Sequence, residues 1–403
     1  MLKRPDASTH TRFTLSPASP WLQGFAAWLA DEGYAHVPAH DHVRRLKQAL
    51  ERLGSPRSSG SFTSAELTAL FSGHGQEVRF NATERAFGRF LRTQAHLVDD
   101  EEPSRYDELL RNYQTHLTEM RGFRVSTVSQ HLSTLSRFLT EALPSNGALG
   151  SLTPKEVEAF VVASGHRVRR QTLQHIVAHL RSFLRFCYDQ RLISHRLDTI
   201  DTPRTYRGEQ PPRALAWDHV LGLLDSVDRS HANGCRDHAM LFLMANYGLR
   251  PSEIASLSVD SIDWVARTLR VEQSKTRTTL ILPLSEEAQG VLRQYLRCAR
   301  PAGTRRELFL SQRSPIGPIT HYAVGDVYSK RARESDLPLE GTSSYGLRHA
   351  FAMRLLTRGV GIKIIGDLLG HRTLESTCVY LRLQTDALRG VALPVPNSDG
   401  RQL

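Results

Sequence analysis

Two arginines in the last part of the chain have sequence contexts that suit phosphate binding. Arg250 lies in Gly-Leu-Arg-Pro-Ser-Glu, just before a proline that fits the first position of a helix. Arg348 lies in Tyr-Gly-Leu-Arg-His, at the entrance to another predicted helix. Backbone N–H groups at a helix start attract anions, and a guanidinium offers two parallel donors to a phosphate. Taken alone, each arginine also fits a surface residue, with Arg250 paired to Glu253.

Three more residues could move a proton or attack phosphorus. Lys275 lies in Ser-Lys-Thr-Arg, a polar turn between two predicted strands, where a lysine can hand over a proton. His371 follows Gly370, which is expected to end a helix and expose the next residue. Tyr380 lies in the short apolar stretch Thr-Cys-Val-Tyr-Leu. Taken alone, Lys275 also fits an ordinary turn residue and Tyr380 fits a core residue.

The order of these residues resembles the catalytic set of the tyrosine recombinase, or phage integrase, family. That set is Arg, Lys, His/Lys-x-x-Arg, His/Trp and Tyr. The contexts Gly-Leu-Arg-x-Ser-Glu, Leu-Arg-His and Leu-Gly-His strengthen the match, which covers residues 213–390 most strongly. The resemblance implies a site-specific DNA recombinase that cuts and rejoins strands through a covalent 3′-phosphotyrosyl intermediate. It implies no metal ion, ATP or other cofactor.

The resemblance also implies a role for each residue. Arg250 and Arg348 would neutralise the non-bridging phosphate oxygens, while Tyr380 attacks phosphorus. Lys275 would protonate the leaving 5′-oxygen, and His371 would hydrogen-bond the scissile phosphate. The full candidate set is Arg250, Lys275, Tyr345, Arg348, His371 and Tyr380, with Glu253 expected to orient Arg250 or nearby helices.

Position 345 departs from the family pattern. The family has His or Lys three residues before the second arginine, and this chain has Tyr345 there. A neutral tyrosine can donate or accept a hydrogen bond, but its ordinary pKa of about 10 makes it a poor general base at pH 7. The change either tunes the rate or marks a weakened member.

The surrounding sequence predicts the elements that position these residues. Apolar residues at helical spacing predict an extra helical domain at 1–98 and a four-helix bundle at 104–200. Residues 213–391 combine helices with a hairpin, and 392–403 form a tail. The predicted fold class is mainly α with a small β-sheet (α+β). By resemblance, the bundle is the core-binding, SAM-like DNA-binding domain and 213–391 the catalytic domain.

Charge indicates a nucleic-acid partner. The chain has 52 Lys and Arg against 41 Asp and Glu, a formal net charge of +11, and basic chains suit polyanions. Five bundle arginines are candidate DNA contacts, with a solvated helix face as the alternative: Arg167, Arg169, Arg170, Arg181 and Arg185. The resemblance implies double-stranded recombination sites, a homo- or hetero-tetramer on DNA, and partner recombinases.

Composition argues against several other classes. The four cysteines lie far apart without a CxxC pair, which argues against zinc knuckles and disulfide scaffolds and favours the reducing cytoplasm. No stretch reaches the roughly 18 consecutive apolar residues of a membrane span. We therefore expect a cytoplasmic protein without a membrane partner.

Two other functions fit the same residues. A type IB topoisomerase-like enzyme would relax DNA with a similar site and would produce no recombinant junctions. A DNA-binding accessory recombinase would be catalytically weakened, with Tyr345 as the sign of that loss. The motifs alone do not separate integration, resolution and transposition by a mobile element, such as a multi-recombinase transposable element.

Overall fold

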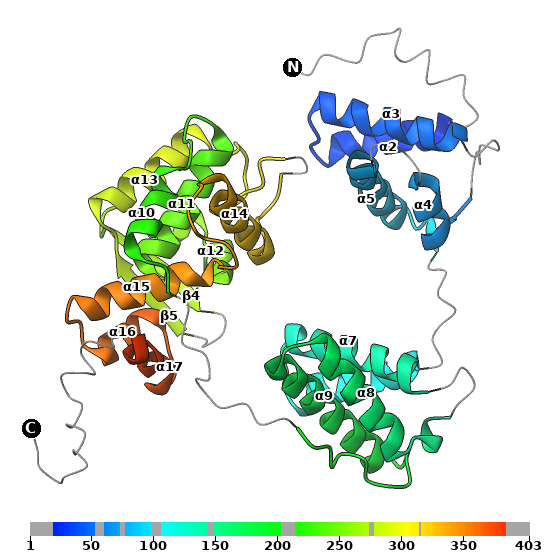
Figure 1. Ribbon diagram of the computed structural model, residues 1–403. Coiled ribbons are helices and arrows are strands. Elements are labelled where there is room, and N and C mark those ends of the chain that lie inside the picture. Colours follow the sequence, from blue (N-terminus) through cyan, green and yellow to red (C-terminus); the bar gives the residue numbers. More distant parts are fainter. Residues whose placement is uncertain are drawn as a thin grey trace, which may run out of the picture. The chain divides into compact units, whose positions relative to one another are not determined.

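The protein is described here from a computed structural model (Figure 1). The described residues are 19–52, 60–72, 77–98, 106–143, 148–202, 214–273, 278–313 and 316–383. The chain divides into two units. One consists of residues 98–209, and the other consists of residues 1–97 together with 210–403. The fold is mainly helical with two small sheets, which confirms the predicted fold class. Lys275 and the predicted tail at 392–403 lie outside the described residues.

The N-terminal block is helical around an aromatic core. Its elements are α2 (Ser19–Asp31), α3 (His36–Arg52), β1 (Phe62–Thr63), α4 (Ser64–Phe71), α5 (Glu77–Thr93) and β2 (Leu97–Val98). Apolar residues at helical spacing, such as Trp21, Phe25 and Phe87, are buried together. The paired strands β1 and β2 were not predicted, because two residues are too few to show a strand periodicity.

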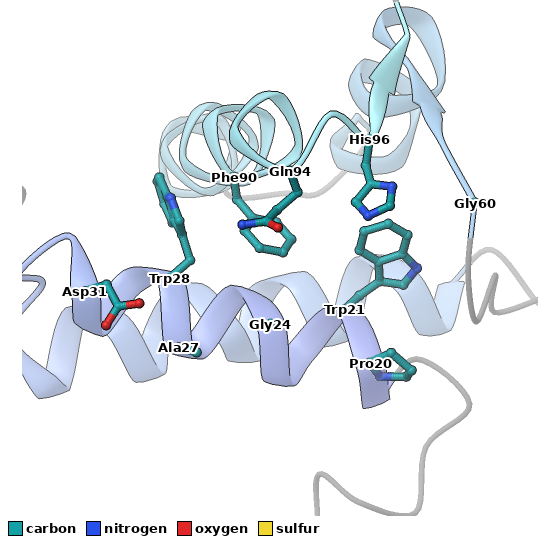
Figure 2. A pocket seen from close by; sticks show the side chains of 10 residues that line it. All are labelled: Pro20, Trp21, Gly24, Ala27, Trp28, Asp31, Gly60, Phe90, Gln94 and His96. Carbon is teal, nitrogen blue, oxygen red and sulfur yellow. The ribbon is translucent and has the colours of Figure 1, made fainter.

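A pocket of about 490 Å³ lies on this block between α2 and α5 (Figure 2). The Trp21 ring meets the His96 ring edge-on at 5.1 Å, and the Trp28 and Phe90 rings lie 6.0 Å apart. Gly24 permits this approach of the helices, since a Cβ there would lie 3.2 Å from Phe90. None of the candidate catalytic residues lines the pocket.

The central unit contains the four predicted helical patterns. They are α6 (Asp107–Thr115), continued by the π-helix η1 (His116–Met120), α7 (Val125–Ala142), α8 (Pro154–Arg167) and α9 (Arg170–Asp189), with a 3-10 turn η2 (Leu149–Ser151) before α8. Thr153 and Glu156 form a capping box around Pro154 at the start of α8. Tyr113 and Phe183 lie at the centre of the core that the helices share.

The C-terminal block surrounds the buried helix α11. Its helices are α10 (Trp217–Asp225), α11 (Ala232–Tyr247), α12 (Pro251–Ser256), α13 (Glu286–Cys298), α14 (His321–Glu334), α15 (Tyr345–Thr357), α16 (Ile362–Leu369) and α17 (Glu375–Cys378), with 3-10 turns η3 (Val259–Ser261) and η4 (Val379–Leu383). Nearly every residue along the middle of α11 is buried, and α10, α12, α13, α14 and α15 all pack against it.

A three-stranded antiparallel sheet completes this block. Its strands are β3 (Ile262–Asp263), β4 (Thr268–Gln273) and β5 (Thr278–Pro283), in the order β3-β4-β5. Leu269 pairs with Leu282 and Val271 with Leu280, so the apolar side chains alternate into the core. The predicted hairpin is β4 and β5, and β3 is an additional edge strand that sequence periodicity did not reveal.

Two glycines end helices beside the candidate catalytic residues. Gly248 ends α11 with φ +63°, and Gly370 ends α16 with φ +61°, a left-handed conformation that favours glycine. Packing also opposes a side chain at both positions, because a neighbouring side chain would have to move. A Cβ at Gly248 would lie 2.6 Å from the Phe351 ring, and one at Gly370 would overlap the Gln273 amide. The turns that precede Arg250 and His371 are therefore fixed by their glycines.

We expect Gly370→Ala to lower the free energy of unfolding by about 1–3 kcal/mol, because alanine is strained at this φ. The new methyl group would also displace Gln273, which is buried at the end of β4. Urea denaturation followed by circular dichroism measures the change. Gly290→Ala is the matched control, because Gly290 lies in α13 and a Cβ there meets nothing within 4 Å. Equal stabilities for the two variants would contradict the constraint.

Candidate active site

Glu253 holds Arg250 at the start of α12. The Arg250 backbone N–H donates to Glu253 Oε2 at 2.8 Å, and Arg250 Nη1 donates to Oε1 at 2.5 Å. The carboxylate therefore accepts one hydrogen bond from a backbone N–H that has no partner within the helix, and another from the guanidinium. Glu253 is 2% exposed, whereas the Arg250 side chain keeps 14% of its surface exposed. The ion pair expected as the alternative is present, and it leaves Arg250 partly accessible.

Arg348 extends from the first turn of α15 into the interior of the block. Its Nη1 donates to the Gly248 carbonyl at 2.6 Å and its Nη2 to the Leu369 carbonyl at 2.5 Å. These carbonyls belong to the ends of α11 and α16, where helical partners are missing. Burial first, and then the nearby Arg250 charge, lower the pKa of Arg348 to about 10, while Glu253 acts in the opposite direction. Arg348 is therefore a protonated, buried cation at pH 7.

Tyr380 is buried beside both guanidinium groups. Its hydroxyl lies 3.1 Å from Nδ1 of His349, and its side chain packs in a small cluster with Leu369. Burial raises the pKa of Tyr380, and the charges of Arg348 and then Arg250 oppose that rise. The phenol consequently keeps its proton at neutral pH and must lose it to become a strong nucleophile.

His371 lies directly after Gly370 and beside the tyrosine ring. Its backbone N–H donates to the Gly366 carbonyl at 2.9 Å, and its Nδ1 lies 2.8 Å from Thr377 Oγ1. The His371 and Tyr380 rings are nearly parallel, with centroids 6.4 Å apart. The short connection between α16 and α17 thus brings the Leu-Gly-His motif against Tyr380.

The structure brings together five of the residues singled out from the sequence. They are Arg250, Glu253, Arg348, His371 and Tyr380. Tyr345 is the first residue of α15 and is 50% exposed, one helical turn before Arg348. Lys275 falls between β4 and β5 and lies outside the described residues.

His349 was not among the predicted site residues. The Leu-Arg-His context of Arg348 supports the family resemblance, but it assigns no role to the histidine. The position after Arg348 on α15 faces η4 and its tyrosine, with ring centroids 5.5 Å apart. That contact joins segments far apart in sequence, so only the fold reveals it.

Arg167, Arg181 and Arg185 each bind an acceptor within the central unit. The pairs are Arg167 with Glu141 at 2.9 Å, Arg185 with Asp198 at 3.0 Å, and Arg181 with Thr202 Oγ1 at 2.9 Å and the Ile200 carbonyl. Arg169 and Arg170 are exposed at the start of α9. The Arg167 and Arg185 side chains remain more than half exposed, so their contact with DNA stays a prediction.

The described residues also bear on metal binding and on membrane crossing. Those residues contain no group of three or more His, Cys, Asp or Glu side chains placed to hold a metal ion. Among them, no helix combines the length and the apolar character that crossing a membrane requires.

Comparison with known proteins matches both the C-terminal block and the bundle. Residues 213–386 match the phage integrase family, and residues 110–191 match the phage integrase N-terminal SAM-like domain. The chain is 30% identical to "Putative integrase/recombinase y4rA" of Sinorhizobium fredii, over 94% of this chain and 95% of that protein. It is 27% identical to tyrosine recombinase XerD of Corynebacterium glutamicum, over 70% of this chain and 96% of that protein.

A solved structure shares the fold. A lambda integrase dimer bound to a COC′ core site superposes with a TM-score of 0.54 at 20% identity, over 80% of this chain and 91% of that chain. The likeness extends the match from sequence motifs to the arrangement of helices and sheet.

Proposed function

Because this chain belongs to the phage integrase family of tyrosine recombinases, we propose that Tyr380 is the nucleophile with which it cuts and rejoins DNA. The chain is an enzyme of site-specific DNA recombination. The observation that carries the assignment of Tyr380 is its position. Its hydroxyl lies beside His349, and Arg348 and Arg250 are close enough for their charges to oppose the rise in its pKa that burial causes.

The two arginines prepare the phosphodiester for attack. A phosphodiester resists nucleophiles because its non-bridging oxygens are negative, and this charge grows as the fifth bond to phosphorus forms. Arg250 presents its accessible edge to one oxygen while Glu253 fixes its orientation. Arg348 is already immobilised by two carbonyls, so it stabilises the transition state without reorganising. His371 acts with the two arginines as a further hydrogen-bond donor to the phosphate.

The covalent step conserves the energy of the phosphodiester. The Tyr380 oxygen attacks phosphorus, forms a 3′-phosphotyrosyl link and expels the 5′-oxygen, to which Lys275 gives a proton. A free 5′-hydroxyl from a partner strand reverses the step and joins the exchanged strand. The reaction therefore needs no ATP.

The substrate is DNA, and we propose that two duplexes are held by four protomers. Support comes from lambda integrase, whose solved structures include a dimer bound to a core site and a tetramer bound to a Holliday junction. In this proposal, residues 104–200 cover one face of the duplex as a core-binding domain and residues 213–391 cover the other. Neighbouring protomers are copies of this chain or partner recombinases. The net charge of +11 suits such a complex, and the cytoplasm is its proposed location.

A nicked suicide duplex tests this function. Fragments of the DNA that flanks the gene are selected by binding to the immobilised full-length protein, and a nicked duplex is made from the selected site. Cleavage releases a short strand that diffuses away, so the protein should remain covalently attached to DNA and migrate as a slower band in a denaturing gel. Specific binding without this band would favour the accessory function.

A second readout separates recombination from relaxation. Two intact copies of the selected site on one plasmid should give recombinant junctions, detected by sequencing across the join. Relaxed plasmid without junctions would favour the topoisomerase-like function, because that activity needs one duplex at a time.

A further inference from the structure

The hydroxyl of Tyr380 has a histidine neighbour that the catalytic set of the family does not include. His349 Nδ1 lies 3.1 Å from the hydroxyl oxygen, within hydrogen-bonding distance. Across the described residues, this is the one side-chain hydrogen bond of the Tyr380 hydroxyl. The histidine sits on α15, one residue after Arg348, and is partly buried.

Attack by Tyr380 requires a proton acceptor at its oxygen. The phenol is protonated at neutral pH because burial raises its pKa. Arg250 and Arg348 are cations and cannot accept the proton. Tyr345 is half-exposed and, as a phenol itself, is a weak base at pH 7. His371 directs Nδ1 to Thr377, with its ring centroid 6.4 Å from that of Tyr380.

We propose that His349 is the general base of DNA cleavage, accepting the Tyr380 proton on Nδ1 as the phenol oxygen attacks phosphorus. The inference rests on the proposed function, because it names the base of that same reaction. It places at residue 349 a task that Tyr345 is chemically unsuited to perform.

The step is balanced in atoms and charge. The bond from phosphorus to the Tyr380 oxygen forms while the bond to the 5′-oxygen breaks. The phenol proton moves to His349 Nδ1, and the leaving oxygen takes a separate proton from Lys275. In the rejoining step, the His349 imidazolium returns its proton to the departing Tyr380 oxygen.

The surroundings of His349 suit a base that must be neutral before cleavage. Burial first, and then the Arg348 charge, lower the pKa of His349 below its ordinary value. The imidazole therefore holds a free lone pair at pH 7. A bound phosphodiester adds negative charge beside Arg348, which favours the imidazolium at the moment when it forms.

The test measures single-turnover adduct formation on the nicked duplex that the wild-type protein cleaves. We expect His349→Ala to slow adduct formation by at least about 10²-fold, with partial rescue by added imidazole. His349→Asn is the decisive variant, because its amide replaces Nδ1 as a hydrogen-bond partner but cannot take a proton. It should therefore remain slow. His231→Ala is the control, because His231 is 82% exposed on the same block.

A modified substrate shows which oxygen the histidine serves. When sulfur replaces the 5′-bridging oxygen, the leaving group departs without a proton. The defect of His349→Ala should persist on this substrate, whereas a defect of Lys275→Ala should be relieved. Relief of the His349→Ala defect would overturn the proposal by assigning the histidine to the leaving group.

The remaining outcomes are equally decisive. Near-normal cleavage by His349→Asn would mean that His349 only positions Tyr380. Near-normal cleavage by His349→Ala would mean that His349 has no role in cleavage. Either result would overturn this inference alone, provided that the wild-type protein forms the adduct. Absence of an adduct with the wild-type protein would overturn the proposed function together with this inference. Thermal melting and gel shift of each variant separate a chemical defect from misfolding.

Discussion

Tyr380→Phe should lower the yield of covalent protein–DNA adduct by at least about 10⁴-fold, because no other group replaces a catalytic nucleophile. The change removes one oxygen and keeps the ring that packs beside Leu369 and Ile365. It also removes the hydrogen bond to His349, which contributes about 1 kcal/mol to stability at most. Binding to the selected DNA site should therefore remain within a few-fold of wild type.

The measurement compares the suicide-substrate adduct with gel shift on the same DNA. Tyr328→Phe is the matched control, because Tyr328 is also buried and its hydroxyl bonds Thr342 at 2.7 Å away from the candidate site. That variant should lose a similar amount of stability and retain cleavage. An undiminished adduct with Tyr380→Phe would mean that another side chain is the nucleophile.

The catalytic motifs were predictable from the sequence because each is anchored to a helix end. Pro251 predicts the start of α12, and Gly370 predicts the end of α16. The structure adds the reason that these ends meet: Arg348 bonds the last carbonyls of α11 and α16. Such a link between remote segments is a property of packing, and local patterns do not encode it.

The features that the sequence did not predict depend on tertiary contacts. The hydrogen bond between His349 and Tyr380 joins α15 to η4, and neither residue predicts this contact from the local sequence. The two-residue strand β3 exists only because β4 offers it partners. The pocket on the N-terminal block similarly requires α2 and α5 to approach each other at Gly24.

Charge patterning was less informative than the motifs. The bundle arginines were chosen as a set because they are basic and neighbouring, yet the structure divides them. Arg185 is bound to Asp198, which holds the segment after α9 against the bundle. Hydrogen bonds from Arg196 first, and then from Arg185, lower the pKa of Asp198 to about 2. Arg169 and Arg170 extend from a helix start. A sequence reports the sign of a charge, whereas the partners of that charge depend on the fold.

Replacing Arg250 or Arg348 with lysine should separate two functions of these arginines, which are the stabilisation of the transition state and the stabilisation of the fold. Arg250→Lys and Arg348→Lys both keep a positive charge and lose the two-pronged guanidinium. We expect each to slow adduct formation by about 10²–10³-fold, the usual cost of losing one transition-state donor. Only Arg348→Lys should also lower the free energy of unfolding substantially, by about 1–3 kcal/mol.

The difference follows from what each guanidinium binds. Arg348 donates through Nη1 to Gly248 and through Nη2 to Leu369, and a single lysine Nζ cannot satisfy both buried carbonyls at once. Arg250 binds Glu253 through its side chain, but its backbone N–H keeps the helix cap whatever the side chain is. Single-turnover cleavage and urea denaturation of the two variants measure both effects. Equal stability losses would mean that Arg348 acts on phosphate alone, whereas cleavage defects that track stability would mean that it acts only through the fold.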